Sequence, residues 1–183
     1  VLAISLQSIK QYHDEKFDKS NFIKNVVLDN ILPGDIYIKS RELHFGNDVP
    51  RVVFLIRQQE PADVAAIDVV TGMFPDKQKD FVLHISESDI VVVKEVKAGS
   101  ESKELVKLAS SIEETLMSEL SVKCLIGIGS VSSQMKDIAK SFKEATTAIE
   151  VGAVFDTEKN IISYENLGIG RLIYQLPITL CEM

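Results

Sequence analysis

Apolar positions in this chain form two kinds of run, one typical of buried strands and one with helical spacing. The stretch from Val122 to Ser130 is of the first kind, because nearly every residue in it is apolar or glycine. Residues 135–153 follow with a stripe of apolar side chains at helical spacing, and their charged side chains fall mainly on other sides. The stripe comprises Ile138, Ala139, Phe142, Ala145, Thr146, Ile149, Gly152 and Ala153, and the charged set comprises Lys136, Lys140, Lys143, Glu144 and Glu150. The pattern predicts a strand inside a sheet that leads into a helix covering it.

Earlier in the chain the same patterns predict strands and helices in a recognisable order. Strands are predicted at Arg51–Arg57, Phe81–Ile85 and Ile90–Val96, and helices at Ala62–Phe74 and Glu101–Leu120. The polar residues 86–89 suit a hairpin turn between the second and third strands. With the strand at Val122–Ser130 the order is β-α-β-β-α-β, the ferredoxin-like arrangement of an α+β fold. The helix at 135–153 and a strand at Ile161–Tyr164 extend a mostly antiparallel sheet.

Residues before this domain are predicted to be helical. Apolar side chains recur at helical spacing through residues 2–32, which indicates a helix that packs on its own domain or on a second copy. Pro33 and Gly34 are expected to end it, and a second helix is predicted at Asp35–Leu43. The turn at Gly46–Pro50 marks the expected domain boundary. The division is therefore an N-terminal helical connector (1–48), the α+β domain (49–167) and an apolar segment (168–183).

That last segment carries too much apolar surface for a free tail in water. Its apolar side chains are Leu172, Ile173, Leu176, Ile178 and Leu180, and they lie around Pro177. The segment is expected to cover the domain, to contact a second copy or to lead into a following domain. Because the chain starts at Val1 and stops inside this apolar run, we expect it to be a piece of a longer protein.

Composition narrows the class of protein. The 183 residues are 45% apolar and carry a formal net charge of −7. Since phosphate binding depends on clustered Lys and Arg, this balance argues against direct binding to nucleic acid or to an anionic membrane. No apolar run approaches the roughly 20 residues that span a bilayer, and no signal-peptide pattern opens the chain. A cytoplasmic protein is predicted, with Cys124 buried and reduced and no bridge to Cys181.

The glycine pairs, histidines and serines do not form a recognisable phosphate-binding, zinc-binding or nucleophilic site. Neither Gly127-Ile128-Gly129 nor Gly168-Ile169-Gly170 completes a dinucleotide-binding pattern or carries the lysine of a P-loop. Close packing of the strand on a helix explains the first pair, and a turn into a helix explains the second. The remaining candidates are separated histidines, which are expected on the surface or half-buried rather than on zinc, and serines expected to begin and cap the helix that follows them. These residues are His13, His44 and His84, and Ser130, Ser132 and Ser133.

Several motifs together resemble a known family. They are Ile128-Gly129-Ser130-Val131-Ser132, Ser141-Phe142-Lys143-Glu144-Ala145 with Ala148, Tyr164-Glu165-Asn166-Leu167-Gly168-Ile169-Gly170-Arg171-Leu172, Asn21-Phe22-Ile23-Lys24 and Leu28-Asp29-Asn30-Ile31-Leu32. The chain resembles the central region of sugar diacid utilisation regulators, the CdaR/PucR type of bacterial transcription factor. The resemblance implies a sensory N-terminal portion, a middle domain with a degenerate GGDEF-type nucleotidyl-cyclase fold, and a C-terminal helix-turn-helix domain. This chain would be the middle domain with its preceding connector.

Cyclases of this fold resemble one another in carrying acidic residues after the first strand and Gly-Gly-Asp-Glu-Phe in the central hairpin. The first strand here is followed by Gln58-Gln59, and the first carboxylate comes only at Glu60. The hairpin retains Glu87 and Asp89 without the two glycines that would let a nucleotide approach the backbone. A solvated turn, with Asp89 bonded to its own backbone, explains this pair better than a metal site. We therefore predict no enzymatic activity, no catalytic or metal-binding residue and no cofactor.

The function predicted from these expectations is a non-catalytic signal-relay and dimerisation domain of a transcriptional regulator. The expected partners are a second copy of the chain and the neighbouring sensory and helix-turn-helix domains, with DNA reached only through the latter and no membrane involved. The alternative is a ligand-sensing domain that binds a nucleotide or small acid without turnover. Arg57, Lys94 and Arg171 are the cations that such a ligand could use, unless they are merely solvated charges.

Overall fold

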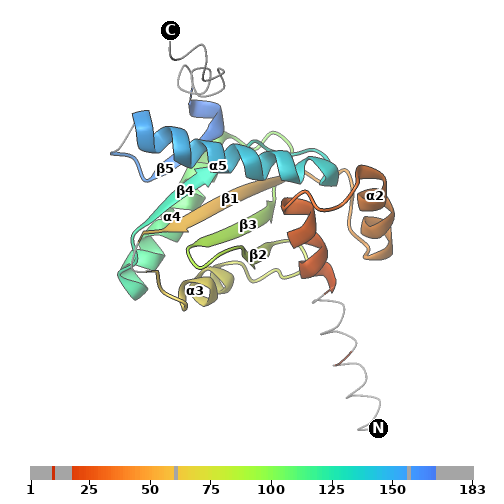
Figure 1. Cartoon of the computed structure of the whole chain (residues 1–183), viewed down its shortest axis with the longest axis horizontal. Coiled ribbons are helices and arrows are strands. Elements are labelled where there is room, and N and C mark those ends of the chain that lie inside the picture. The colour runs from red at the N-terminus through yellow and green to blue at the C-terminus, as the bar shows by residue number, and fades with distance from the viewer. Residues whose placement is uncertain (1–9, 11–17, 60–61, 156–157, 168–183) are drawn as a thin grey trace.

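A five-stranded sheet with helices on both faces forms the centre of the computed structural model, which describes residues 10, 18–59, 62–155 and 158–167 (Figure 1). In chain order the elements are a helix over residues 18–27, α2 (Pro33–Glu42), β1 (Arg51–Gln58), α3 (Ala66–Met73), β2 (Phe81–His84), β3 (Asp89–Glu95), α4 (Ser102–Leu120), β4 (Cys124–Ile128), the 3₁₀ turn η1 (Met135–Asp137), α5 (Ile138–Phe155), β5 (Ile161–Ser163) and the 3₁₀ turn η2 (Tyr164–Asn166).

The strand order is β2-β3-β1-β4-β5, with β1 at the centre. β1 pairs antiparallel with both β3 and β4, β2 and β3 form an antiparallel hairpin, and β5 joins β4 in parallel. A parallel neighbour requires a crossover, and α5 supplies it. The ferredoxin-like order of elements and its extension by a helix and a fifth strand are therefore confirmed.

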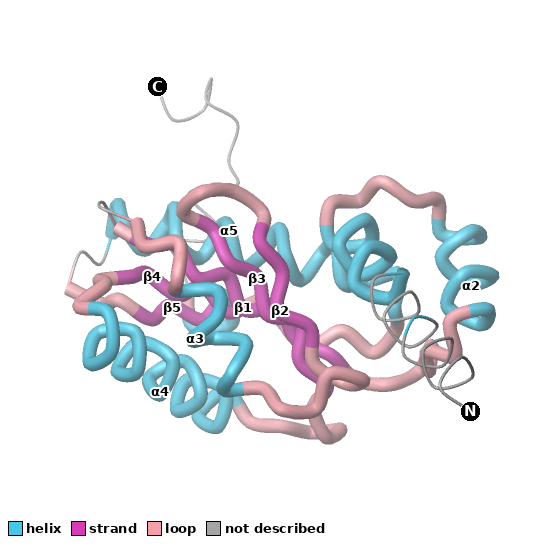
Figure 2. Tube along the Cα trace, turned by 90° about the horizontal axis from the view of Figure 1, so that it is seen from below, coloured by secondary structure: helices cyan, strands magenta, loops and turns pink. Residues whose placement is uncertain are grey.

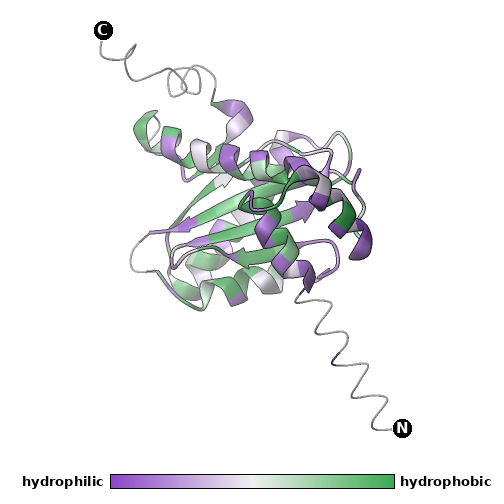
Figure 3. Cartoon of the chain, turned by 45° about the vertical axis from the view of Figure 1, so that its right-hand side comes forward, coloured by the Kyte–Doolittle hydropathy of each residue, from purple (hydrophilic) through white to green (hydrophobic). Residues whose placement is uncertain are grey.

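Alternation along β1 divides the core in two. Val52, Phe54 and Ile56 lie in the cluster formed with α3 and α4, whereas Val53 and Leu55 lie in the cluster formed with α5 and the N-terminal helices. All of these side chains are at most 1% exposed. Because both faces of the sheet are covered, β1 reads as a continuous apolar run rather than an alternating one, as the hydropathy colouring of the strands shows (Figure 3).

The N-terminal region departs from the sequence prediction. The described helix ends at residue 27, and Asp29 has a left-handed backbone with φ of 59°. Pro33 is the first residue of α2 rather than the end of the preceding helix. Proline suits that position because the first N–H groups of a helix have no partner within it and the ring fixes a helical φ. The prediction for residues 2–9 and 11–17 falls outside the described residues, and so does the prediction for 168–183.

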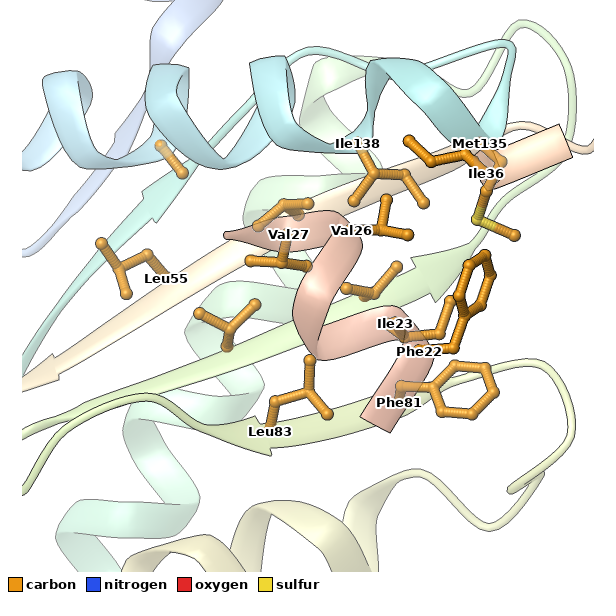
Figure 4. Packing of buried hydrophobic residues seen from close by; sticks show 14 of the residues in the cluster. Phe22, Ile23, Val26, Val27, Ile36, Leu55, Phe81, Leu83, Met135 and Ile138 are labelled. Atoms are coloured by element: carbon orange, nitrogen blue, oxygen red, sulfur yellow. The ribbon is translucent and has the colours of Figure 1, made fainter. Parts of the chain in front are cut away.

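The helix over residues 18–27 packs on its own sheet. Ile23, Val26 and Val27 are at most 1% exposed and belong to the same cluster as Leu55 and Leu83 (Figure 4). This observation decides, for the described part of the helix, between the two packing alternatives that the sequence left open. The helix and α2 lie side by side at one end of the sheet (Figure 2). The domain limits themselves stay a prediction.

Arg51 anchors the turn that joins α2 to the sheet. Its side chain is buried, and an Nη1 N–H donates to the carbonyl of Gly46 at 2.9 Å. The guanidinium also lies 5.9 Å from the ring centroid of Phe45, which packs between Phe22 and Phe81. Burial lowers the pKa of Arg51, and Glu95 partly opposes this. The turn is thereby held to the first residue of β1.

None of the helices in the described ranges has both the length and the apolarity needed to cross a bilayer. Cys124 is buried and free, as predicted, while Cys181 lies outside the described residues. Desolvation raises the pKa of the Cys124 thiol to about 12, with a further contribution from Glu113.

Candidate functional site

The end of β1 and the β2–β3 turn are the place where a cyclase of this fold would be expected to hold metal and substrate. Arg57 and Asp89 lie directly opposite each other in the β1–β3 ladder. Arg57 Nε donates to Asp89 Oδ1 at 2.9 Å, and Arg57 Nη2 donates to Asp89 Oδ2 at 3.1 Å. The side chains are 34% and 16% exposed, so the pair is partly withdrawn from water. The result is a bidentate ion pair between the end of β1 and the start of β3.

This pair corrects two expectations. Asp89 was expected to bond its own backbone in a solvated turn, and Arg57 to be a solvated or ligand-binding cation. In the structure the two side chains form an ion pair with each other instead. The hydrogen bonds from Arg57 to Asp89 raise the pKa of Arg57 against the opposing effect of burial, and the negative charges of Asp89 and of Glu150 on α5 add to the rise.

The turn itself is closed by its backbone and by a serine. The N–H of Ile85 donates to the carbonyl of Asp89 at 3.0 Å, and the N–H of Asp89 donates to Ser86 Oγ at 3.2 Å. Gln58 N–H donates to the carbonyl of Ser88 at 2.8 Å, which ties the turn to the end of β1. Glu87 is exposed at the tip, and Glu60 lies outside the described residues. The polar groups of the hairpin therefore serve to hold the hairpin together.

Metal binding finds no support among the residues that the structure describes. They contain no group of three or more His, Cys, Asp or Glu side chains able to hold an ion. His84 is exposed at the end of β2 and His44 is exposed in the turn after α2, so the fold does not bring them together. His13 lies outside the described residues.

Gly127 in β4 and Gly129 just after it have a packing role, as predicted. A Cβ at Gly127 would lie 2.9 Å from Ile149 Cγ1 and would overlap the backbone of Ala145. A Cβ at Gly129 would overlap the backbone and hydroxyl of Ser141. Contacts this short are not found in real structures, so α5 can approach β4 only where the strand has no side chain. The second glycine pair, at 168 and 170, lies outside the described residues.

A protein-family model describing a GGDEF-like domain matches residues 30–151, which is more than half of the chain. The chain belongs to the GGDEF-like domain family. A search of curated proteins finds no match. The family match covers the strands that carry Arg57 and Asp89 and the glycine-bearing strand with α5, so the features described above lie within the GGDEF-like domain.

The serines after β4 in this GGDEF-like domain do not cap the following helix. The residue at the N-cap of η1 is Gln134, and it makes no side-chain capping bond. Ser132 Oγ donates instead to the carbonyl of Asp137 at 3.0 Å. Ser130 donates to the Glu144 carboxylate through its N–H at 2.9 Å and also through its hydroxyl. The prediction of a capping role for these serines is therefore wrong.

Glu144 was predicted to lie off the apolar face of its helix, yet its exposure is only 7%. Its carboxylate is held by Ser130, and Lys140 Nζ lies 3.9 Å from the other oxygen. One turn earlier on α5, the Ser141 hydroxyl donates to the carbonyl of Ser130 at 2.8 Å and accepts the N–H of Val53 at 3.2 Å. The sequence signal for this network is a serine and a glutamate three residues apart on an otherwise apolar helix face.

Lys94, the other candidate cation that the structure describes, does not lie beside Arg57. Lys94 Nζ lies 3.3 Å from Asp80 Oδ2 and 5.6 Å from the ring centroid of Phe74. Phe74 belongs to the cluster on the α3 and α4 face of the sheet, so Lys94 lies on the face opposite to Leu55 and its neighbours. Arg171 lies outside the described residues. Of the candidate cations that the structure describes, Arg57 and Lys94 therefore lie on opposite faces of the sheet, and each is paired with a carboxylate of its own.

Proposed function

We propose that this GGDEF-like domain is a non-catalytic relay and dimerisation domain of a bacterial transcriptional regulator of the sugar diacid utilisation type. The observation that carries the non-catalytic part is the ion pair between Arg57 and Asp89. A metal-dependent reaction on a nucleotide requires hard carboxylate oxygens that are open to Mg²⁺. Both oxygens of Asp89 instead accept hydrogen bonds from a guanidinium.

The charge of Arg57 acts in the same direction. A guanidinium remains protonated at every physiological pH, so it repels a divalent cation placed at the same edge. Gln58 adds no carboxylate, and its Oε1 accepts the N–H of Asp63 at 2.9 Å to hold the loop after β1. The edge is therefore arranged for internal bonding rather than for metal-assisted chemistry.

Dimerisation is supported by exposed apolar residues on α2 and just before it. Ile36 on this helix is buried in the core cluster that includes Met135, whereas Tyr37 and Ile38 are 54% and 58% exposed, and Leu32 just before the helix is 72% exposed. Exposed large apolar side chains are typical of an interaction surface when a partner covers them. A second copy that packs on α2 would bring the same residues into a two-fold interface. We call Leu32, Tyr37 and Ile38 the α2 patch.

A relay role is supported by the way the N-terminal helices are attached. Val26 and Val27 lie in one cluster with Leu55 of the central strand, and Met135 and Ile138 extend that cluster towards α5. A rearrangement that moved the helix over residues 18–27 would therefore have to repack the sheet face and α5, since close-packed interiors do not deform smoothly. In the proposed protein, DNA would be contacted only by a helix-turn-helix domain outside this chain.

The test of the non-catalytic role is a turnover assay. The chain is incubated with GTP or ATP and either Mg²⁺ or Mn²⁺, and the nucleotides are separated by anion-exchange chromatography. We expect no cyclic or dinucleotide product above the level of a protein-free control. A product that forms with this chain and disappears in the Asp89→Ala variant would overturn the proposal.

A ligand-sensing domain is the second candidate function, and a cavity beside β5 favours it. It is lined by both apolar and polar side chains and has a volume of about 480 Å³, within the roughly 300–1,000 Å³ typical of small-molecule pockets. A thermal-shift screen with nucleotides and sugar diacids tests this function, because a selective ligand raises the melting temperature by mass action. No shift with any of them would count against those ligand classes.

A further inference from the structure

The walls of the cavity beside β5 are mainly apolar. Val106 of α4, Phe155 of α5 and Ile161 of β5 all line it. Phe155 is 54% exposed and the other two are half-buried, so the described part of the chain leaves this apolar surface partly open to water. Removing apolar surface from water is favourable by about 25 cal/mol per Å². The cavity therefore favours an occupant with apolar side chains.

Two side-chain contacts show how far the cavity wall runs along α4. Asn160, immediately before the lining residue Ile161, donates through Nδ2 to Glu113 Oε1 at 2.8 Å. Asn166, which lines the cavity, has its Nδ2 3.5 Å from Ser102 Oγ. Ser102 begins α4 and Glu113 lies about three turns later, which is about 16 Å along the helix axis. A segment of polypeptide chain suits a cavity of this length.

The apolar segment 168–183 is joined directly to this cavity. Leu167 lines the cavity, and the segment begins at the next residue. Arg171 and Glu182 are the charged residues of the segment, and most of the residues between them are apolar. A short flexible attachment gives a binding segment an effective concentration on the order of millimolar at its site. It also avoids the loss of translational and rotational freedom that a separate partner undergoes.

We propose that the cavity beside β5 is the docking site of residues 168–183 of the same chain. The sequence left three destinations open for this segment, and the proposal selects the first of them, in which the segment covers its own domain. Its apolar side chains would cover Phe155 and Val106. The inference is independent of the relay and dimerisation proposal and of its turnover assay. It concerns the same cavity as the ligand-sensing candidate, and a ligand there would have to displace the segment.

The test places a nitroxide spin label in the middle of the segment of the ¹⁵N-labelled 183-residue chain, through Gln175→Cys in a Cys181→Ser background. The label then replaces a polar side chain, and Cys124, at 2% exposure, stays unlabelled. Relative to the chemically reduced label, the amide signals of Phe155 and Ile161 should lose intensity at least twofold. Those of β2, at the opposite edge of the sheet and about 19 Å from β5, should lose much less. No loss, or an equal loss at both edges, would overturn the inference.

A mixed sample distinguishes the chain's own segment from that of a second copy. It contains the ¹⁵N-labelled chain without the nitroxide and the nitroxide-bearing chain at natural isotope abundance. We expect no loss of intensity at Phe155 and Ile161 in this sample. A loss there equal to that in the first sample would show that the segment of another copy occupies the cavity, and the proposal would be wrong.

Two neighbouring variants separate docking from mere attachment at Leu167. Phe155 and Val154 are exposed apolar residues at the end of α5, at 54% and 67%, and of the two only Phe155 lines the cavity. Phe155→Glu should at least halve the intensity loss at Ile161, because an unpaired charge covered by an apolar segment is costly. Val154→Glu should leave that loss unchanged. If the two variants have the same effect, or if Phe155→Glu has none, the label is near the cavity only because the chain is attached there, and the inference is overturned.

Discussion

Gly129 lies against Ser141 so closely that a side chain at position 129 would overlap the Ser141 carbonyl oxygen. Directly beside this contact, the Ser141 hydroxyl links Val53 of β1 to the carbonyl of Ser130. The β1–β4 ladder ends at the pairing of Phe54 with Ile128. The Ser141 hydroxyl of α5 therefore provides a partner for the N–H of Val53 and for the carbonyl of Ser130, just beyond the end of this ladder.

Gly129→Ala is expected to destabilise the domain by about 3 kcal/mol, at the upper end of the usual cost of overpacking. The obstacle is backbone of α5 and cannot rotate away as a flexible side chain would. Urea unfolding followed by circular dichroism measures the change. Gly34→Ala is the matched control, because a Cβ at Gly34 meets nothing within 4 Å, and it should leave the free energy of unfolding unchanged or slightly higher. Equal losses in the two variants would contradict the packing role.

Ser141→Ala is expected to cost about 2 kcal/mol, because it leaves the buried N–H of Val53 and the carbonyl of Ser130 without this partner. Ser111→Ala is the control: Ser111 is exposed on α4, and its hydroxyl donates to the carbonyl of Lys107 at 3.1 Å. That change should alter the free energy of unfolding by less than about 0.5 kcal/mol. Hydrogen exchange should also speed up at the Val53 amide in Ser141→Ala, and a protected amide would contradict this account.

The order of strands and helices was predictable from the sequence because each element has an apolar pattern of its own. The close contact of α5 with β4 was also predictable, since two glycines in an otherwise apolar strand indicate that the backbone of another element packs closely against the strand. The prediction at residue 33 was wrong because proline is found both just after the end of a helix and in the first turn of a new one. The composition of residues 28–34 does not distinguish these positions.

Arg57 and Asp89 should be coupled by about 1 kcal/mol in a double-mutant cycle with Arg57→Ala and Asp89→Ala. The two-pronged geometry and the 16% exposure of Asp89 favour coupling, while the 34% exposure of Arg57 lets solvent screen part of it. The exposed pair Lys39–Glu42 on α2, with a separation of 3.6 Å, is the control and should give no more than about 0.5 kcal/mol. Coupling in the first pair that does not exceed the second would show that the pair has no special role.

This ion pair could not be predicted from the sequence. Arg57 and Asp89 are 32 positions apart, and their meeting depends on the register between β1 and β3. A slip of one residue would place them on opposite faces of the sheet. The buried Glu144 was missed for a related reason, since helical spacing places it near the edge of the apolar stripe and only the position of Ser130 shows which side it joins.

Cys124 should make stability fall at alkaline pH. The folded thiol keeps its proton up to about pH 12, whereas a thiol at its ordinary pKa of 9.0 ionises earlier. Above pH 9 the unfolded chain therefore loses a proton that the folded chain retains, so the stabilisation present below pH 9 is lost progressively towards pH 12. In urea titrations, Cys124→Ala should show a shallower decline over this range than the unchanged chain. Parallel declines would mean that Cys124 does not contribute.

The α2 patch yields the sharpest test of dimerisation. Ile38→Glu places a charge on α2 at a residue that is 58% exposed. In sedimentation equilibrium we expect the unchanged chain to have twice the mass of one chain and Ile38→Glu to weaken the dimer at least tenfold, because a buried unpaired charge is costly at an interface. Val64→Glu is the matched control, since Val64 is an exposed apolar residue, at 93%, away from α2. A dimer that tolerates Ile38→Glu as well as Val64→Glu would place the interface elsewhere, and a monomeric unchanged chain would remove dimerisation from the proposed function.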